Sequence, residues 1–310
     1  FVQNPWYPVA EPSDAQASAD TADASRDLTA ELVKLVQAMQ EIKAEEDSRV
    51  NSYEIFVNQK QTHIRNSRGV DVTFSGFDCE IEVVTNSRKD DHEIEIYKDL
   101  RFSDKSAEKI IAEVRGMFHT GRQRLNAVPT RQNEHADVLL TGNAVGSFFQ
   151  YFAMHTNASY QYMGVAKAKI GEAITGADAD PLNIRLVPTL DGSAKNAPYD
   201  ETGMPVAERV LFENGICRSY WGSLQHAHYI GMKDTTSMNN MVVEGGSKTL
   251  DELRSMPHIE ITDFSAFDMD AVSGTCGGEI RLAYESDGTT SHPTTCLLYT
   301  SPSPRDTERS

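Results

Sequence analysis

The sequence has few cysteines, no long apolar run and a shortage of positive charge. Its four cysteines among 310 residues lie far apart and form no Cys-x-x-Cys pair, which argues against a disulfide framework or a zinc ribbon. No run approaches the roughly 18 apolar residues that a membrane-spanning helix needs. Scattered, reduced thiols and the absence of an apolar span favour a cytoplasmic protein that does not bind a membrane.

Basic side chains number 29 against 46 acidic ones, so the net charge is −17. Most of this surface repels a phosphate backbone, because non-specific affinity for nucleic acid comes from Lys and Arg that displace counterions. The charge therefore argues against nucleic-acid binding. The length is typical of about two domains.

The two ends of the sequence are unusual. The chain begins at Phe1 with neither an initiator Met nor a signal peptide, and we expect a fragment. Residues 1–24 are rich in Ala, Ser, Asp and Pro and are typical of a linker, or of the remnant of a truncated N-terminal domain. Residues 294–310 resemble translated sequencing-adapter DNA, and from Cys296 onward they show no periodicity. We interpret them as a non-native tail outside the fold.

Residues 25–130 are predicted to form an α+β middle domain. Apolar residues at helical spacing predict a helix over 27–43. Alternating residues over 49–102 predict an antiparallel meander of four or five strands with one solvated, acidic face. A second helix over 106–122, with Ser106 as its N-cap, is expected to cover the other face.

Residues 131–293 are predicted to form a second, mostly β domain that begins after a polar joint at 129–134. The pattern predicts a strand at 136–140, an aromatic-rich helix after it, and an irregular or helical stretch over 157–180. The remaining predictions are strands at 184–189, 259–264 and 279–284, and a long polar loop over 232–250.

A hairpin in this second domain is the clearest local signal. Asn214-Gly215 separates two β-rich runs, 206–212 and 216–220, and tolerates the positive φ that a type I′ turn needs at both positions. Residues 200–203 form the entry turn, and Pro205 is predicted to start the first strand from an edge.

The residues alone give few chemical signals. His226 and His228 could share a metal on a strand, but the sequence around them favours a helix, on which they would point apart. His92-Glu93 lacks the second His of a His-Glu-x-x-His motif. Residues 142–146 lack the Lys of a phosphate-binding loop, and Cys276 after Gly274 is favoured as an inert thiol in a tight turn.

Several segments, taken together, resemble the TldD/PmbA family, whose members are also called modulators of DNA gyrase. The matching pieces run in family order and cover about three quarters of the chain. They are the turn at 66–69, the strand end at 101–103, the strand and helix at 138–152, the turn at 199–203, the hairpin at 214–215 and the stretch 274–284.

The resemblance implies an α+β fold in which an antiparallel or mixed sheet with covering helices is followed by a mostly β, barrel- or sandwich-like domain. It also implies a pair of subunits, TldD-type and PmbA-type (TldE), that form a cytoplasmic peptidase for unfolded peptides. In the TldD type, a helix carries His-Glu-x-x-x-His, and a downstream Cys completes a zinc site. Placing residues 138–140 on the preceding strand aligns Gln150, Tyr151 and His155 with that motif, and His155 alone matches.

This departure favours the PmbA side of the family. A zinc peptidase needs a carboxylate to move the proton of metal-bound water, and Tyr151 is a poor base at neutral pH. We therefore expect a non-catalytic subunit with no catalytic residue and no cofactor of its own, zinc being held by a TldD-like partner. The alternative to this pairing is a homodimer of the chain. An edge strand could bind an extended peptide, although no substrate-binding residue can be named from the sequence.

Two alternatives remain. One is an active, TldD-like metallopeptidase with an altered zinc site built from His155, His226 or His228. The other is a plain α+β peptide-binding module whose family resemblance is accidental.

Overall fold

The computed structural model describes residues 6–14, 26–130, 136–176 and 179–300, with side chains up to residue 295. Much of the predicted linker, most of the polar joint and the last ten residues of the predicted tail lie outside these ranges. The description below concerns the described residues.

Three long antiparallel strands form the first sheet, in the order β1-β2-β3. They are β1 (Ser48–Arg65), β2 (Asp71–Lys89) and β3 (His92–Phe102). The predicted meander is confirmed, but its four or five strands are three. The polar run Asn58–Lys60 does not break β1, because it pairs in register with Gly76–Asp78 while its own three side chains are exposed to solvent.

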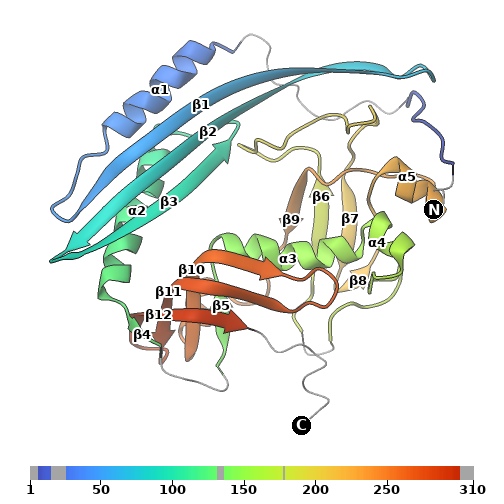
Figure 1. Cartoon of the computed structure of the whole chain (residues 1–310). Helices are drawn as coiled ribbons and strands as arrows, with labels where there is room; N and C mark the ends of the chain where they lie inside the picture. The colour runs from blue at the N-terminus through green and yellow to red at the C-terminus, as the bar shows by residue number, and fades with distance from the viewer. Residues whose placement is uncertain (1–5, 15–25, 131–135, 177–178, 301–310) are drawn as a thin grey trace, which may run out of the picture.

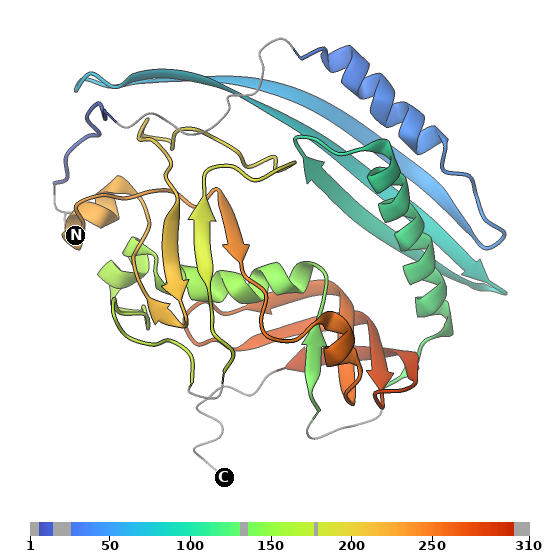
Figure 2. The ribbon, with the colours of Figure 1, turned by 180° about the vertical axis from the view of Figure 1, so that it is seen from behind.

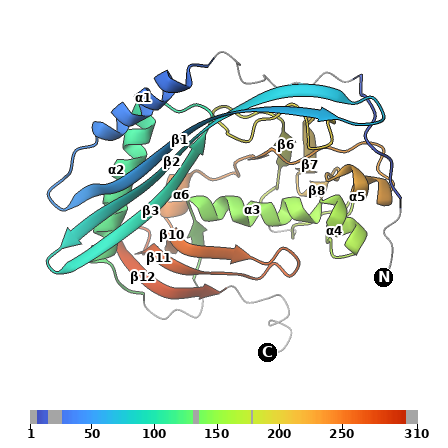
Figure 3. The ribbon, with the colours of Figure 1, turned by 45° about the horizontal axis from the view of Figure 1, so that its top comes forward.

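Two helices cover one face of this sheet, as Figures 1 and 3 show. They are α1 (Leu28–Gln40), capped by Asp27, and α2 (Ala107–Asn126), capped by Ser106, and both match the predicted helices. Their apolar stripes and the inward residues of the strands form one core. It includes Leu35, Met39, Cys79, Ile81, Val83, Leu100, Phe102, Ile110, Val114 and Phe118.

The opposite face of the first sheet is solvated and acidic, as predicted. Glu54, Glu82 and Asp99 lie directly side by side across the three strands. Like charges in such a row repel one another; solvent and the Arg101 guanidinium, 2.8 Å from Asp99 Oδ2, lessen that repulsion.

The second sheet joins segments from distant parts of the chain, in the order β4-β12-β11-β10-β5. Its strands are β4 (Val128–Pro129), β5 (Val138–Leu140), β10 (His258–Met269), β11 (Cys276–Ser286) and β12 (Ser291–Thr300). Strand β12 corrects one expectation: the tail from residue 294 was expected outside the fold, yet 294–300 pair with β11 through main-chain hydrogen bonds, which need no side-chain periodicity.

The third sheet has the order β8-β7-β6-β9. Its strands are β6 (Ile184–Val187), β7 (Arg209–Glu213), β8 (Ile216–Cys217) and β9 (Asn240–Val243). Short helices connect these parts, namely α4 (Ala158–Met163), α5 (Leu224–Tyr229) and α6 (Leu250–Arg254). The long polar loop expected over 232–250 is therefore interrupted by β9 and the start of α6.

Helix α3 (Asn143–His155) lies between the second and third sheets, as Figures 1 and 2 show. Phe149, Phe152 and Ala153 of this helix pack in one core with Leu182, Ile184 and Leu211 at the third sheet. The chain is thus α+β, and its C-terminal half is sandwich-like. Within the described ranges, the strands do not close into a barrel.

The predicted hairpin is confirmed between β7 and β8, with φ of 51° at Asn214 and 76° at Gly215. Its strands are shorter than predicted. Pro205 does not start β7, because it takes part in an isolated bridge with Tyr199 in the turn that precedes the strand.

That turn holds the tip of the β1–β2 hairpin against the C-terminal half. Asp200 Oδ1 accepts hydrogen bonds from the backbone N–H groups of Thr202 and Met204, at 2.8 and 3.0 Å. Gly203 has φ of +84°, and a Cβ there would lie 2.5 Å from Val70 Cγ1. The turn can approach the hairpin this closely because residue 203 has no side chain.

No helix in the described part of the chain is long and apolar enough to cross a membrane.

Candidate functional site

Helix α3 carries the three positions that the sequence singled out. It begins after Gly142, whose φ of 69° turns the chain sharply out of β5. A Cβ at Gly142 would lie 3.1 Å from the carbonyl oxygen of Thr262, so the start of the helix lies in close contact with β10. This contact fixes α3 alongside the free part of β10.

His155 ends the helix and is fully buried. Its Nδ1 accepts a hydrogen bond from the backbone N–H of Lys167 at 3.1 Å, and its buried Nε2 has no hydrogen-bond partner among the described residues. Burial, together with the nearby Lys167 ammonium, lowers the pKa of His155 to about 4. The ring is therefore neutral at pH 7, and its proton lies on Nε2.

Tyr151 lies one helical turn before His155 and connects α3 to the turn between β10 and β11. Its hydroxyl accepts a hydrogen bond from Lys167 Nζ at 2.7 Å, and the same ammonium donates to the Ser273 carbonyl at 3.2 Å. A Cβ at Gly274 would lie 3.1 Å from the Tyr151 hydroxyl. Tyr151 thus packs between α3 and the turn that joins β10 to β11.

Gln150 is exposed and points to a different surface from the buried His155. It lines a cavity of about 280 Å³ together with Tyr151, Met154 and Phe267. As an exposed residue in the lining of this cavity, Gln150 suits contact with a bound molecule better than a shared metal site with the buried ring of His155.

These three side chains do not fit a zinc ion. In the tautomer that the Lys167 N–H imposes, His155 Nε2 carries a proton and offers no lone pair. The Lys167 ammonium, 2.7 Å from the Tyr151 hydroxyl, would repel a dication. No group of three or more His, Cys, Asp or Glu side chains in the described ranges is arranged to hold a metal.

A groove runs along α3 on the side of Gln150. A second cavity, of about 220 Å³, lies between the start of α3 and β10, and Ser147 and Phe267 line both cavities. Strand β5 pairs with only Ile259–Ile261 of β10. Within the described chain, β10 from Thr262 to Met269 therefore has no strand on the side away from β11. The groove thus combines an open strand edge with a helix wall.

The other sequence candidates lie elsewhere. His226 and His228 are on α5, as the helix prediction required; Ser223 Oγ lies 3.0 Å from His226 Nδ1, and the His228 ring meets the edge of Trp6. His92 is exposed at the start of β3, a solvated position as expected.

The cysteines within the described side chains are buried and free. Burial raises the pKa of Cys79 to about 12 and that of Cys217 to about 11, so both thiols stay protonated and unreactive at neutral pH. Cys276 starts β11 directly after the tight turn at Gly274, whose φ is +81°. The predicted tight turn is confirmed.

Sequence reasoning did not identify Lys167 or Gly274 as parts of this site. Lys167 lies in the stretch predicted as irregular or helical, and Gly274 lies more than a hundred residues beyond α3. No local pattern shows that these residues meet Tyr151, because the contact depends on how distant elements pack.

Comparison with known proteins defines the class of this chain. Residues 133–298, more than half of the sequence, match the profile of the PmbA/TldA metallopeptidase C-terminal domain. The chain belongs to the PmbA/TldD family. A comparison with curated proteins finds no match.

Solved structures show the same fold. TldE from Thermococcus kodakarensis has a TM-score of 0.76 and 18% identity, with coverage of 96% of this chain and 71% of that protein. A protein from Thermotoga maritima that is named as a modulator of DNA gyrase has a TM-score of 0.79 and 16% identity, with coverage of 97% and 72%. A similarly named protein from Bacteroides thetaiotaomicron has a TM-score of 0.69 and 16% identity, with coverage of 94% and 68%.

Proposed function

We propose that this chain is a PmbA/TldE-like, non-catalytic subunit of a TldD/TldE-type zinc metallopeptidase that acts on unfolded or small peptides. Its partner is a TldD-like subunit, which holds the zinc ion and performs the hydrolysis. This chain completes the assembly and forms part of the wall along which a peptide lies. We place the assembly in the cytoplasm, where the thiols of Cys79 and Cys217 would stay reduced.

The observation that carries this proposal is the state of Tyr151 and His155. Hydrolysis by a zinc peptidase needs a base that takes the proton of metal-bound water. The residue at the base position is a tyrosine whose hydroxyl accepts a hydrogen bond from an ammonium, and the one matching ligand has its Nδ1 lone pair engaged. Both side chains serve packing and hydrogen bonding.

The groove along α3 supports a role in peptide binding. An extended peptide can add to an open strand edge through main-chain hydrogen bonds, which are independent of the peptide's sequence. Residues 262–269 of β10 offer such an edge, and Ser147, Gln150 and Tyr151 of α3 form the facing wall. We assign the peptide to this groove.

Activity measurements on the separate and combined subunits test the proposal. The chain should not hydrolyse an unstructured peptide alone, and hydrolysis should appear when a co-encoded TldD-like chain is added and disappear on chelation. Hydrolysis by this chain alone that chelation abolishes would instead support an active peptidase with an altered zinc site. Failure to associate with the TldD-like chain would favour a homodimer or a separate peptide-binding module, and either result would overturn the proposal.

A further inference from the structure

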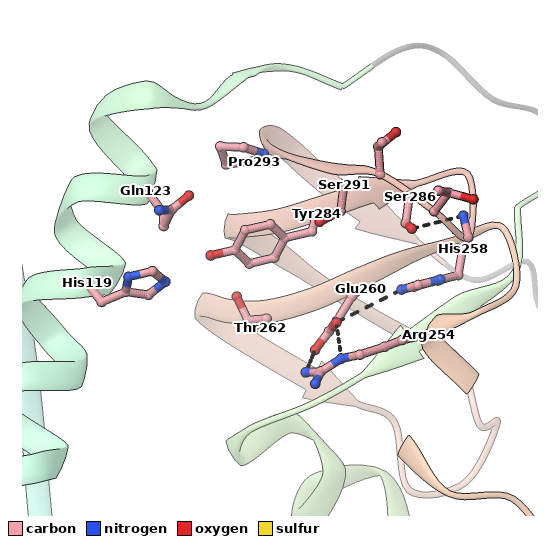
Figure 4. Close-up of a pocket in the computed structure, with 13 residues that line it drawn as sticks. His119, Gln123, Arg254, His258, Glu260, Thr262, Tyr284, Ser286, Ser291 and Pro293 are labelled. Carbon is pink, nitrogen blue, oxygen red and sulfur yellow. Dashed lines mark hydrogen bonds and ion pairs between the residues drawn. The ribbon is translucent and has the colours of Figure 1, made fainter. Parts of the chain in front are cut away.

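A larger cavity lies away from α3, between helix α2 and the face of the second sheet. It has a volume of about 600 Å³, which is in the range of small-molecule sites. Figure 4 shows His119 and Gln123 on α2, opposite Glu260, Thr262 and Tyr284 on the strands. The cavity therefore has walls from two parts of the chain that are distant in sequence.

An ion pair between the exposed Arg254 and the buried Glu260 lines this cavity. Glu260 is 6% exposed, and Arg254 from α6 binds its two carboxylate oxygens through Nη2 and Nε, at 2.7 and 2.9 Å. The pair is neutral in sum. A cationic ligand would be repelled by Arg254 and an anionic ligand by Glu260, so neither gains net Coulomb energy here.

His258, which is also buried, leaves one hydrogen-bonding position open beside this pair. Its Nδ1 lies 2.6 Å from the Met256 carbonyl oxygen, so Nδ1 carries a proton; with this tautomer, Nε2 is an acceptor. Nε2 lies 4.0 Å from Glu260 Oε2, which is also an acceptor. A hydrogen-bond donor of a bound molecule that lies between these two acceptors, or reaches both of them, would satisfy them.

A hydroxyl group meets these requirements, because it donates to Glu260 or His258 and can accept from the remaining N–H groups of Arg254. The hydroxyl of Tyr284 and the amide of Gln123 add groups that both donate and accept, and the Thr262 hydroxyl, which donates to the Leu282 carbonyl at 3.2 Å, adds an acceptor. We propose that this cavity binds a neutral small molecule with several hydroxyl groups, a sugar or another polyol. This site does not depend on the proposed subunit role, and of the residues named for it only Thr262 also lines the groove along α3.

A ligand in this position would touch α2 on one side and the second sheet on the other. Its binding would therefore hold these two parts together, and ligand that binds only the folded state raises the unfolding temperature. A site built to hydrogen-bond hydroxyl groups should also discriminate strongly against analogues that lack them.

The test uses the full chain and isothermal titration calorimetry with D-glucose, D-ribose and myo-inositol, alongside putrescine and inorganic phosphate as charged probes. We expect at least one polyol to bind and to raise the unfolding temperature. Tyr284→Phe, which keeps the ring, and Gln123→Leu on the opposite wall should each weaken that binding about fivefold, the effect of one ordinary hydrogen bond. Tyr97→Phe on the exposed face of the first sheet is the matched control and should change nothing.

Three results would overturn the inference. They are the absence of binding by all three polyols to the folded wild-type chain, polyol binding that neither Tyr284→Phe nor Gln123→Leu weakens, and tighter binding of putrescine or phosphate than of any polyol. The thermal unfolding of each variant without ligand shows that the fold is retained, so a lost affinity reports on the cavity.

Discussion

The rings of Tyr151 and His155 meet edge to face, with their centroids 4.5 Å apart. One helical turn separates the two residues, so α3 itself sets this contact. Tyr151 occupies the position where the resemblance to the TldD type places a catalytic glutamate. A residue that would act on water in the catalytic subunit packs here against a neutral, buried imidazole.

Removing the Tyr151 ring should destabilise the chain through loss of this packing. We expect Tyr151→Ala to lower the free energy of unfolding by roughly 2–4 kcal/mol, and Tyr151→Phe, which loses only the hydrogen bond from Lys167, by about 1 kcal/mol. Urea unfolding followed by circular dichroism measures both. Tyr97→Phe on the solvated face is the control. A Tyr151→Ala variant as stable as the wild type would show that the contacts of Tyr151 do not stabilise the fold.

His155 should make the chain less stable as the pH falls. The pKa is lowered to about 4 in the folded chain, against about 6.5 in an unfolded one, so the unfolded state binds the proton first. The stability contribution is complete above pH 6.5 and is lost on going down to pH 4, by roughly 2–3 kcal/mol. His155→Asn, which keeps an acceptor for the Lys167 N–H, should lose less stability than the wild type over this range.

Exposed His119→Asn is the matched control for that titration, and it should follow the wild-type pH profile. Acid also removes the stability contributed by carboxylates whose pKa is lowered. One of them is Asp270, which accepts hydrogen bonds from the Ser273 side chain and from backbone N–H groups. This loss is the same in all three proteins. Parallel profiles for His155→Asn and the wild type would mean that the ring is not buried in its neutral form.

Filling the groove along α3 should block peptide binding without unfolding the chain. Ser147 lines both cavities, so Ser147→Trp places a large side chain across the groove. We expect peptide hydrolysis by the assembly with a TldD-like subunit to show a raised KM. Ala112→Trp on the exposed surface of α2 is the control; equal KM values for the two variants would place the peptide elsewhere.

Gly203 should be needed for the attachment of the β1–β2 hairpin tip. An alanine at position 203 would have to adopt a φ of +84°, and its Cβ would lie 2.5 Å from Val70 Cγ1. We expect Gly203→Ala to cost about 1–3 kcal/mol of unfolding free energy. Gly76→Ala in the same hairpin, where an added Cβ meets nothing within 4 Å, should be close to neutral, and equal losses would contradict this account.

Local sequence patterns predicted the elements whose stability depends on near neighbours. The stripe of α1, the cap at Ser106 and the Asn214-Gly215 turn all follow from residues a few positions apart, and all three are confirmed. Polar strand residues were harder to interpret. Asn58–Lys60 was interpreted as a break because solvated ribbon residues do not alternate.

Long-range contacts explain what the sequence could not show. Strand β12 pairs through its backbone, so its side chains carry no signal, and β9 is held by β6 more than fifty residues earlier. At the candidate site, the sequence supplied Gln150, Tyr151 and His155, but not the ammonium of Lys167 that fixes the state of two of them. The boundaries proposed for the two domains and the non-native origin of the tail stay predictions.

The most direct test of the central claim is the zinc content of the chain, purified alone at neutral pH with zinc available and measured by elemental analysis. The account predicts a value near zero, because the only matching ligand is a buried imidazole whose accepting nitrogen is engaged with Lys167. A value near one zinc per chain that falls to zero in His155→Asn would contradict it. This chain would then be a metallopeptidase subunit with a metal site of its own.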